Sequence, residues 1–358
     1  MTNNTNASAA APKVLTTVLL LLLTSSLLFV LASNNNSILI LAKVSKKKLS
    51  LSSPSSSSPS FSTTTSHHIL KKNNIGQEAI GTSMGSSGSS SSITKAVIIN
   101  FDDGSKGQFT YAKPILDQYG FKATFFIVCN YANSGSKNYM NWNEITQLQN
   151  DGQDIESHTM NHRDLTALPL NEVNFEVGQS KQCLLDHDII NNGVGVNVFA
   201  YPFHEGPNDP TIVNTVAKYY DIARSGNIPL QFLNVATDRY SVAGINVALT
   251  TQTTSNSYYD SQILANFIKL VNSQDKYNTK GGGQINAIPI IVYHTIDYNS
   301  LDPNNTNPDL FSAEMKYLHD NGFRVLTMTD LKYSQNTNSL YLGDIPGITA
   351  GGVGRYRY

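Results

Sequence analysis

The chain of 358 residues is long enough for one large domain or two ordinary ones. Its formal net charge of −1 gives no electrostatic reason to expect a nucleic acid partner. Only 14% of its residues are charged. Because Ser, Thr and Asn are plentiful as well, the composition is more typical of secreted or surface proteins than of cytosolic ones.

Residues 1–48 combine an apolar stretch with a basic flank. Val14 to Ala32 carries no charge and is close to the roughly 20 residues that a helix needs to cross a bilayer. The small residues at its end favour a cleaved signal peptide, and an uncleaved membrane anchor is the alternative. Four lysines between Lys43 and Lys48 outnumber Lys13, which disfavours export by an uncleaved anchor. We expect an exported protein that is either secreted or held at the cell membrane by this helix.

Residues 49–92 are dominated by serine, with prolines at 54 and 59 and a later Gly/Ser run. Such a segment lacks the apolar surface that would offset the entropy of ordering it. We interpret it as a disordered, flexible linker. His67 and His68 within it are interpreted as solvated linker residues rather than a metal site.

From residue 93 to residue 335, strand-like apolar runs alternate with helix-like segments. The strand candidates are 96–101, 123–128, 154–157, 198–200, 288–294 and 324–326. The helix candidates are 111–119, 142–149, 171–185, 210–218, 311–320 and one that begins at 329–333. Such alternation predicts an α/β domain whose mostly parallel sheet is open or closed into a barrel. Residues 336–358 form a tail to which we assign no role.

The chain contains two cysteines, Cys129 and Cys183, which are too few for a disulfide framework. They form one bridge if the domain is exported, or they are two buried thiols, and the sequence leaves both possibilities open. Neither belongs to a CxxC pair, so a thiolate zinc site is not expected.

Polar clusters directly follow four of the strand candidates: Asp102-Asp103-Gly104, the segment from His158 to His162, Tyr201-Pro202-Phe203, and His294. In α/β barrels the carboxyl ends of the strands meet at one face, so these groups should converge. Alone, Asp-Asp-Gly would indicate a turn, and a His pair would be a surface feature. Together, one carboxylate and two imidazoles predict a three-ligand metal site with open positions.

The motifs resemble the signatures of the polysaccharide deacetylases, also called carbohydrate esterase family four or the nodulation-factor deacetylase homology domain. The four matching segments are Asn100–Gly104, Ser157–His162, Phe199–Phe203 and Ile291–His294. The resemblance extends over roughly residues 95–333. It implies a distorted (β/α) barrel with about seven parallel strands.

The resemblance also implies a role for each site residue. Asp103, His158 and His162 would bind a divalent metal, for which zinc is our first choice. Asp102 would be the general base that takes a proton from metal-bound water. His294 would be the general acid that protonates the leaving amine.

The resemblance implies two further roles, at the third signature, in which Ala200 stands where many members have Arg, and at Asp238-Arg239-Tyr240, which resembles a segment with an arginine that some members use to orient the base. The backbone N–H of Tyr201 would face the developing oxyanion. Arg239 would replace the missing arginine and orient the base. His204-Glu205 stand where many members have Gly, which leaves the choice of substrate open.

The implied function is that of a hydrolase of carbon–nitrogen bonds other than peptide bonds, which removes N-acetyl groups from an N-acetylated sugar polymer. An exported, tethered domain favours a polymer at the cell surface. Three alternatives remain: a same-fold hydrolase acting on other C–N bonds or O-acetyl esters, a non-catalytic glycan-binding module, and a non-haem iron oxygenase. Oxygenases with this ligand set usually have jelly-roll sheets, which the alternation of strands and helices contradicts. The sequence does not define the oligomeric state.

Overall fold

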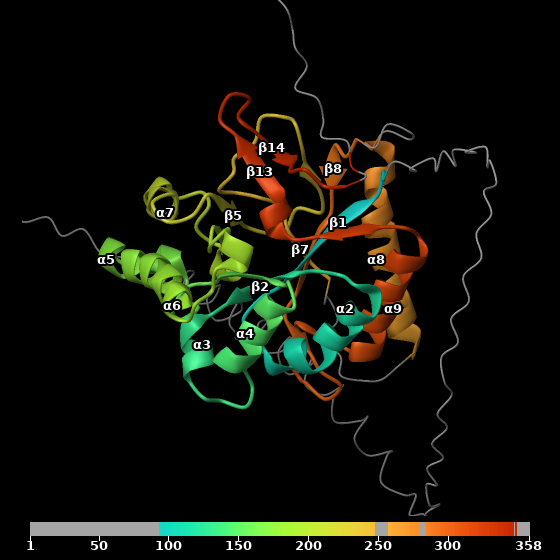
Figure 1. Ribbon diagram of the computed structural model, residues 1–358, viewed down its shortest axis with the longest axis horizontal. Coiled ribbons are helices and arrows are strands. Elements are labelled where there is room, and N and C mark those ends of the chain that lie inside the picture. Colours follow the sequence, from blue (N-terminus) through green and yellow to red (C-terminus); the bar gives the residue numbers. More distant parts are fainter. Residues whose placement is uncertain (1–92, 248–256, 279–283, 347, 349–358) are drawn as a thin grey trace, which may run out of the picture. The chain divides into compact units, whose positions relative to one another are not determined.

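The computed structural model describes residues 93–247, 257–278, 284–346 and 348 (Figure 1). The signal peptide or anchor predicted for residues 1–48 and the linker predicted for residues 49–92 lie outside these residues. Among the described helices, none has the length and hydropathy that a membrane crossing requires.

A parallel sheet of eight strands forms the centre of the fold. The strand order is β5-β4-β3-β2-β1-β9-β7, and β12 pairs with β1 beside this path. The strands are β1 (Ala96–Phe101), β2 (Thr124–Ile127), β3 (Asp154–Ser157), β4 (Val198–Ala200), β5 (Ile222–Arg224), β7 (Ile245–Asn246), β9 (Ile290–Tyr293) and β12 (Arg324–Leu326). Every residue of β1 is buried, as expected for a strand that is covered on both faces.

The two ends of this strand path approach each other. Arg224 at the end of β5 forms a parallel bridge with Val242, and shortly afterwards β7 pairs with β9. The sheet therefore curls into a distorted barrel, which confirms the predicted fold class. The eighth strand, β12, pairs with residues 96–98 of β1, because β2 pairs with residues 100–101.

Helices pack around the sheet. They are α2 (Lys113–Tyr119), α3 (Cys129–Asn133), α4 (Trp142–Asn150), α5 (Leu170–Asn174), α6 (Ser180–Asp186), α7 (Pro210–Val216), α8 (Ser257–Asn272) and α9 (Pro308–Asp320). Helix α9 packs against both α2 and α8 (Figure 1). The helix predicted over 171–185 consists of α5 and α6 joined by a π-helical segment, η3 (Phe175–Gln179). Helix α8 was not predicted.

Three two-stranded sheets complete the described fold: β6 (Gln231–Phe232) with β8 (Ala287–Ile288), β10 (Thr295–Ile296) with β11 (Asn305–Thr306), and β13 (Leu331–Ser334) with β14 (Ser339–Leu342). The helix predicted to begin at 329–333 is wrong. A short turn, η7 (Met328–Asp330), leads into β13 instead, and Leu331 and Leu340 are buried in the core. The β13–β14 hairpin crosses residue 335, where the sequence analysis ended the domain.

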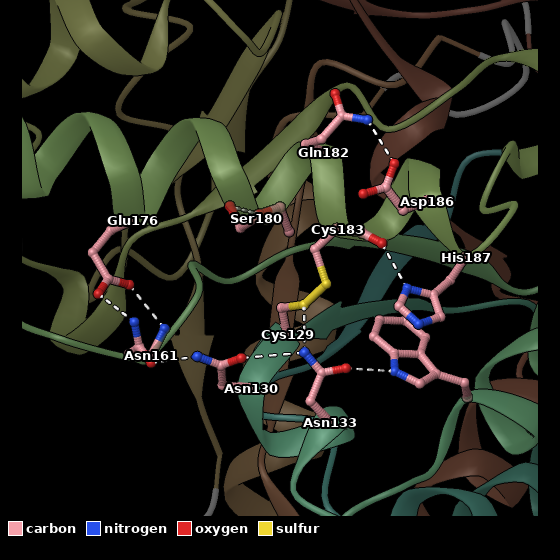
Figure 2. Close-up of a disulfide and its surroundings, with 12 residues drawn as sticks. Cys129, Asn130, Asn133, Asn161, Glu176, Ser180, Gln182, Cys183, Asp186 and His187 are labelled. Carbon is pink, nitrogen blue, oxygen red and sulfur yellow. Dashed lines mark hydrogen bonds between the residues drawn. A yellow bond between two sulfur atoms is a disulfide. The ribbon is translucent and has the colours of Figure 1, made fainter.

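Cys129 and Cys183 form a disulfide, with their Cα atoms 6.5 Å apart. The bond joins α3 to α6 (Figure 2). The sequence alone had left the pairing open, because the two residues are 54 positions apart and belong to separate helices.

Candidate metal centre

Asp103, His158 and His162 form one compact cluster at the carboxyl ends of β1 and β3. Each offers one ligand atom, and these atoms all lie within 4.8 Å of one another. The Oδ1 atom of Asp103 is 3.6 Å from Nε2 of His158 and 3.2 Å from Nε2 of His162. The structure therefore brings together the three side chains that the sequence selected as metal ligands.

The backbone at this cluster adopts conformations that non-glycine residues rarely have. The φ angles are 73° at Asp103, 72° at Thr159 and 57° at His162. For a β-branched residue such as Thr159, a positive φ is a clear outlier. Outliers of this kind concentrate at functional sites, where the surrounding contacts must hold them.

His158 is oriented by a hydrogen bond on the side away from Asp103. Its Nδ1 lies 2.8 Å from the carbonyl oxygen of Ala200. Because a carbonyl can only accept, Nδ1 carries the proton and Nε2 keeps its lone pair. Burial lowers the pKa of His158 to about 3, and burial also lowers the pKa of His162. Both rings are therefore neutral at pH 7, the form in which histidine binds a metal.

Asp103 lacks a partner for one of its oxygens. Within the described part of the chain, its Oδ1 atom is buried and accepts no hydrogen bond. Burial, together with the charge of Asp102, raises the pKa of Asp103 to about 6. A cation next to this oxygen would supply the missing partner and favour the ionised carboxylate. One carboxylate and two neutral imidazoles fit a divalent cation such as zinc.

Asp102 has a different environment from its neighbour. Its Oδ1 and Oδ2 atoms accept hydrogen bonds from Nη2 of Arg224 at 2.7 and 2.6 Å. The Asp102 and Arg224 side chains are only 2% and 0% exposed. Burial would raise the pKa of Asp102, but the Arg224 guanidinium and the nearby histidines outweigh it and hold the pKa well below its usual value. The pKa of Asp102 is thus lowered, whereas the pKa of the adjacent Asp103 is raised.

Arg239 does not orient Asp102, which corrects the sequence prediction. Its guanidinium carbon lies 4.8 Å from the ring centroid of Tyr240 and 4.6 Å from that of Tyr333. Arg224 makes the predicted contact instead. It is the last residue of β5, which runs parallel to β4, so it lies at the same end of the sheet as the other site residues. Sequence reasoning missed Arg224 because it lies 122 positions from Asp102, and only the pairing of β5 with β4 places it beside that carboxylate.

The backbone N–H of Tyr201 is also not free to serve as the predicted oxyanion donor. It donates to the carbonyl oxygen of Arg224 at 3.1 Å, which extends the pairing of β4 with β5. Pro202 has no N–H, so the next backbone donor is that of Phe203. Phe203 has a φ of 57°, and its ring centroid lies 4.6 Å from that of His162. Phe203 is therefore the next residue along the chain whose backbone N–H could take the role expected of Tyr201.

His294 directly follows β9 and lies beside Asp102. Its Nε2 atom is 3.9 Å from Oδ2 of Asp102, and its side chain is 14% exposed. The carbonyl oxygen of His294 accepts hydrogen bonds from Oγ of Ser105 and Nε2 of Gln108. Gln108 also donates to the carbonyl oxygen of Asp102, so one side chain holds the ends of β1 and β9 together.

A cleft of about 780 Å³ begins beside this centre. Its lining includes Ser105, which follows the Asp-Asp-Gly turn, and Thr295, which follows His294. Tyr111 and Tyr139 contribute aromatic rings to its wall. The rest of the lining is mostly polar, and it includes neither His294 nor any of the three candidate ligands.

Removal of one ligand should weaken cation binding sharply. We expect His162→Ala to lower the affinity for Zn²⁺ by more than about 100-fold, because changes to residues that merely orient ligands already cost about 10–100-fold. Competition with a chromophoric chelator measures this affinity. His319→Ala is the matched control, since His319 is exposed on α9. Equal affinities of the two variants would contradict the assignment of His162 as a ligand.

A family model described as polysaccharide deacetylase matches residues 90–221. The resemblance to the polysaccharide deacetylase family is confirmed over this stretch. It contains Asp102, Asp103, His158 and His162, and it ends before Arg224 and His294.

One relative is similar to this chain over a shorter stretch. "Putative polysaccharide deacetylase YxkH" of Bacillus subtilis (strain 168) is 34% identical over 88 residues, which are 25% of this chain and 31% of YxkH. The match therefore spans about a third of the length of that relative.

Two solved structures match this chain at low sequence identity. The Xyl-CE4 domain of a multidomain xylanase, from the hindgut metagenome of Trinervitermes trinervoides, is 19% identical with a TM-score of 0.44, covering 66% of this chain and 88% of that one. A family 4 carbohydrate esterase from Streptomyces lividans, solved with acetate, is 16% identical with a TM-score of 0.43, covering 70% and 100%. The site assignments above rest on the geometry of this chain.

Proposed function

We propose that this protein is a metal-dependent hydrolase that removes N-acetyl groups from an N-acetylated sugar polymer. The observation that carries the proposal is the meeting of Asp103, His158 and His162 at one point, with Asp102 and His294 beside them. The family match over residues 90–221 supports the same conclusion. We propose zinc as the metal, because imidazole nitrogens and carboxylate oxygens are among its usual ligands.

A divalent cation held by Asp103, His158 and His162 would act as a Lewis acid at the acetyl carbonyl and make a water molecule more acidic. Asp102 is ionised and fixed by Arg224, so it can accept a proton from the attacking water. The pair of bonds to one guanidinium keeps the carboxylate in one orientation. The N–H of Phe203 would donate a hydrogen bond to the oxygen on which negative charge develops.

His294 lies beside Asp102 and is partly open to solvent. An amine is a poor leaving group until it is protonated, and a protonated imidazole can supply that proton. We therefore assign His294 as the general acid for C–N bond cleavage.

Replacement of His294 should separate two kinds of substrate. We expect His294→Ala to slow the hydrolysis of an N-acetyl sugar by about 10²–10⁴-fold, the contribution typical of a general acid. Hydrolysis of an activated aryl acetate should fall much less, because its leaving group needs no proton. Rates with both substrates measure the effect, and equal losses would count against His294 as the acid.

We propose that the enzyme acts outside the cytoplasm, either secreted or anchored through the apolar helix predicted within residues 1–48. The disulfide between Cys129 and Cys183 supports this location, because such bonds persist mainly in oxidising compartments. Residues 49–92 would then act as a linker between that helix and the catalytic domain.

Acetate release from a matched set of oligosaccharides tests the proposed reaction. We expect release from chitooligosaccharides or peptidoglycan fragments, with one new free amine for each acetate. Release from O-acetylated xylan alone would favour an esterase of the same fold. Binding to these glycans without release of acetate would instead indicate a non-catalytic module.

A further inference from the structure

The loop with both candidate histidine ligands, residues 158–162, is held from one flank by the start of α3. The backbone N–H of Cys129 donates to the carbonyl oxygen of Thr159 at 3.2 Å. The backbone N–H of Asn130 donates to that of Met160 at 2.9 Å. Two consecutive backbone bonds therefore fix the middle of the loop relative to α3.

Glu176, in η3, holds the same loop from the other flank (Figure 2). Its side chain is fully buried, and its two carboxylate oxygens accept hydrogen bonds from the backbone N–H and the Nδ2 atom of Asn161, each at 2.8 Å. The N–H of Met160 donates to the Glu176 carbonyl oxygen at 3.2 Å. Asn161 immediately precedes His162, so these bonds act on the backbone that carries a ligand.

The disulfide connects the two flanks covalently (Figure 2). Cys129 begins α3, and Cys183 lies in α6, which continues directly from η3 and Glu176. The flanks also meet at Asn161, whose Oδ1 atom accepts a hydrogen bond from Nδ2 of Asn130 at 2.6 Å. Asn161 is thus held by Glu176 and by Asn130, and the disulfide limits how far these two can separate.

The loop needs such support because its conformation is not locally favoured. Thr159 and His162 have φ angles of 72° and 57°, in the left-handed region. Within the loop, the hydroxyl of Thr159 accepts a hydrogen bond from the N–H of His162 at 2.9 Å. Conformations of this kind persist only when surrounding contacts hold them.

We propose that Glu176 and the Cys129–Cys183 disulfide are positioning elements of the cation site. They hold residues 158–162 in the conformation that presents His158 and His162 to Asp103. The proposal rests on the cation site of the proposed function, but its readout is cation affinity rather than deacetylation. Because the disulfide is part of the support, the affinity depends on the redox state of the two cysteines.

The Zn²⁺ affinity of the full chain, measured by competition with a chromophoric chelator, tests the role of Glu176. We expect Glu176→Gln to weaken binding by about 10–100-fold, the range found for residues that orient metal ligands. The glutamine presents an NH₂ group to donors that need an acceptor. Asp186→Asn is the matched control, because Asp186 is exposed on α6 and accepts its hydrogen bond from Gln182 at the surface.

The same measurement of Zn²⁺ affinity tests the role of the disulfide. The wild type, after reduction and removal of the reductant, should bind Zn²⁺ at least several-fold more weakly, and reoxidation should restore the affinity. The Cys129→Ser/Cys183→Ser double variant should have the weaker affinity under both conditions.

Unfolding without Zn²⁺ is followed for every variant, so that affinities are compared only between folded proteins. If Glu176→Gln does not fold, Asn161→Ala replaces it, because it removes the side-chain donor to Glu176 and leaves the disulfide in place. A folded variant that binds Zn²⁺ with wild-type affinity overturns the positioning role of Glu176. Equal Zn²⁺ affinities of the oxidised and reduced wild type overturn the positioning role of the disulfide. A wild type that binds no Zn²⁺ overturns the proposed function itself.

Discussion

Asp102→Asn is expected to lower the rate of deacetylation by about 10²–10⁴-fold, the usual contribution of a general base. The asparagine keeps the shape of the side chain but cannot take a proton from the attacking water. Zn²⁺ affinity should change little, because the ligand atoms belong to Asp103, His158 and His162. Acetate release and Zn²⁺ titration on the same preparation measure the two quantities.

The variant Asp103→Asn provides the comparison for this experiment. It replaces the carboxylate in the ligand cluster, so we expect Zn²⁺ affinity and activity to fall together. If Asp102→Asn lost the metal while Asp103→Asn kept it, the roles of the two aspartates would be reversed. Their different environments predict the opposite, since Asp102 is bonded to Arg224 and Asp103 faces the two imidazoles.

Arg224→Met is expected to reduce the free energy of unfolding by about 3–5 kcal/mol at pH 7, the cost of leaving a buried charge without its partner. In the wild type, Arg224 holds the pKa of Asp102 below its unfolded value of about 3.9. Its contribution to stability is therefore complete above that value and is lost only as the pH falls further.

In the variant the sign reverses, because burial without Arg224 raises the pKa of Asp102 above the unfolded value. The loss in the free energy of unfolding is then largest at neutral pH, and it becomes smaller as the Asp102 carboxylate is protonated. Urea unfolding of metal-free protein should show a smaller difference between variant and wild type at pH 4 than at pH 7. A difference that does not depend on pH would mean that Arg224 contributes through packing alone.

Arg239→Met is the natural control for Arg224→Met. Arg239 lies over the rings of Tyr240 and Tyr333, and its contacts are those of a partly exposed cation. We expect a loss of no more than about 1 kcal/mol, in the range of exposed cation–π contacts. A larger loss for Arg239→Met than for Arg224→Met would contradict the stabilising role of the Arg224–Asp102 pair.

The cation ligands could be predicted from the sequence because their positions follow from two general features. Asp103 lies two residues after β1 and His158 directly follows β3, and the carboxyl ends of parallel strands share one face. His162 followed from its short separation from His158. The same reasoning placed His294 after β9, beside Asp102.

The residues that the sequence did not reveal depend on tertiary contacts. Arg224 belongs to a strand of three residues, and only the pairing of β5 with β4 brings it to Asp102. The same pairing of β5 with β4 occupies the N–H of Tyr201, which donates to the carbonyl oxygen of Arg224. The role of Glu176 depends on a helix packing against the loop of residues 158–162, a contact that no local pattern encodes.

Acetate release by the full chain, before and after removal of bound metal, tests whether the cation site is catalytic. We expect that a chelator abolishes release from chitooligosaccharides, and that one equivalent of Zn²⁺ per chain restores it in the wild type but not in His162→Ala. Equal release by the chelated and the Zn²⁺-loaded enzyme would contradict the assignment of Asp103, His158 and His162 as a catalytic metal site.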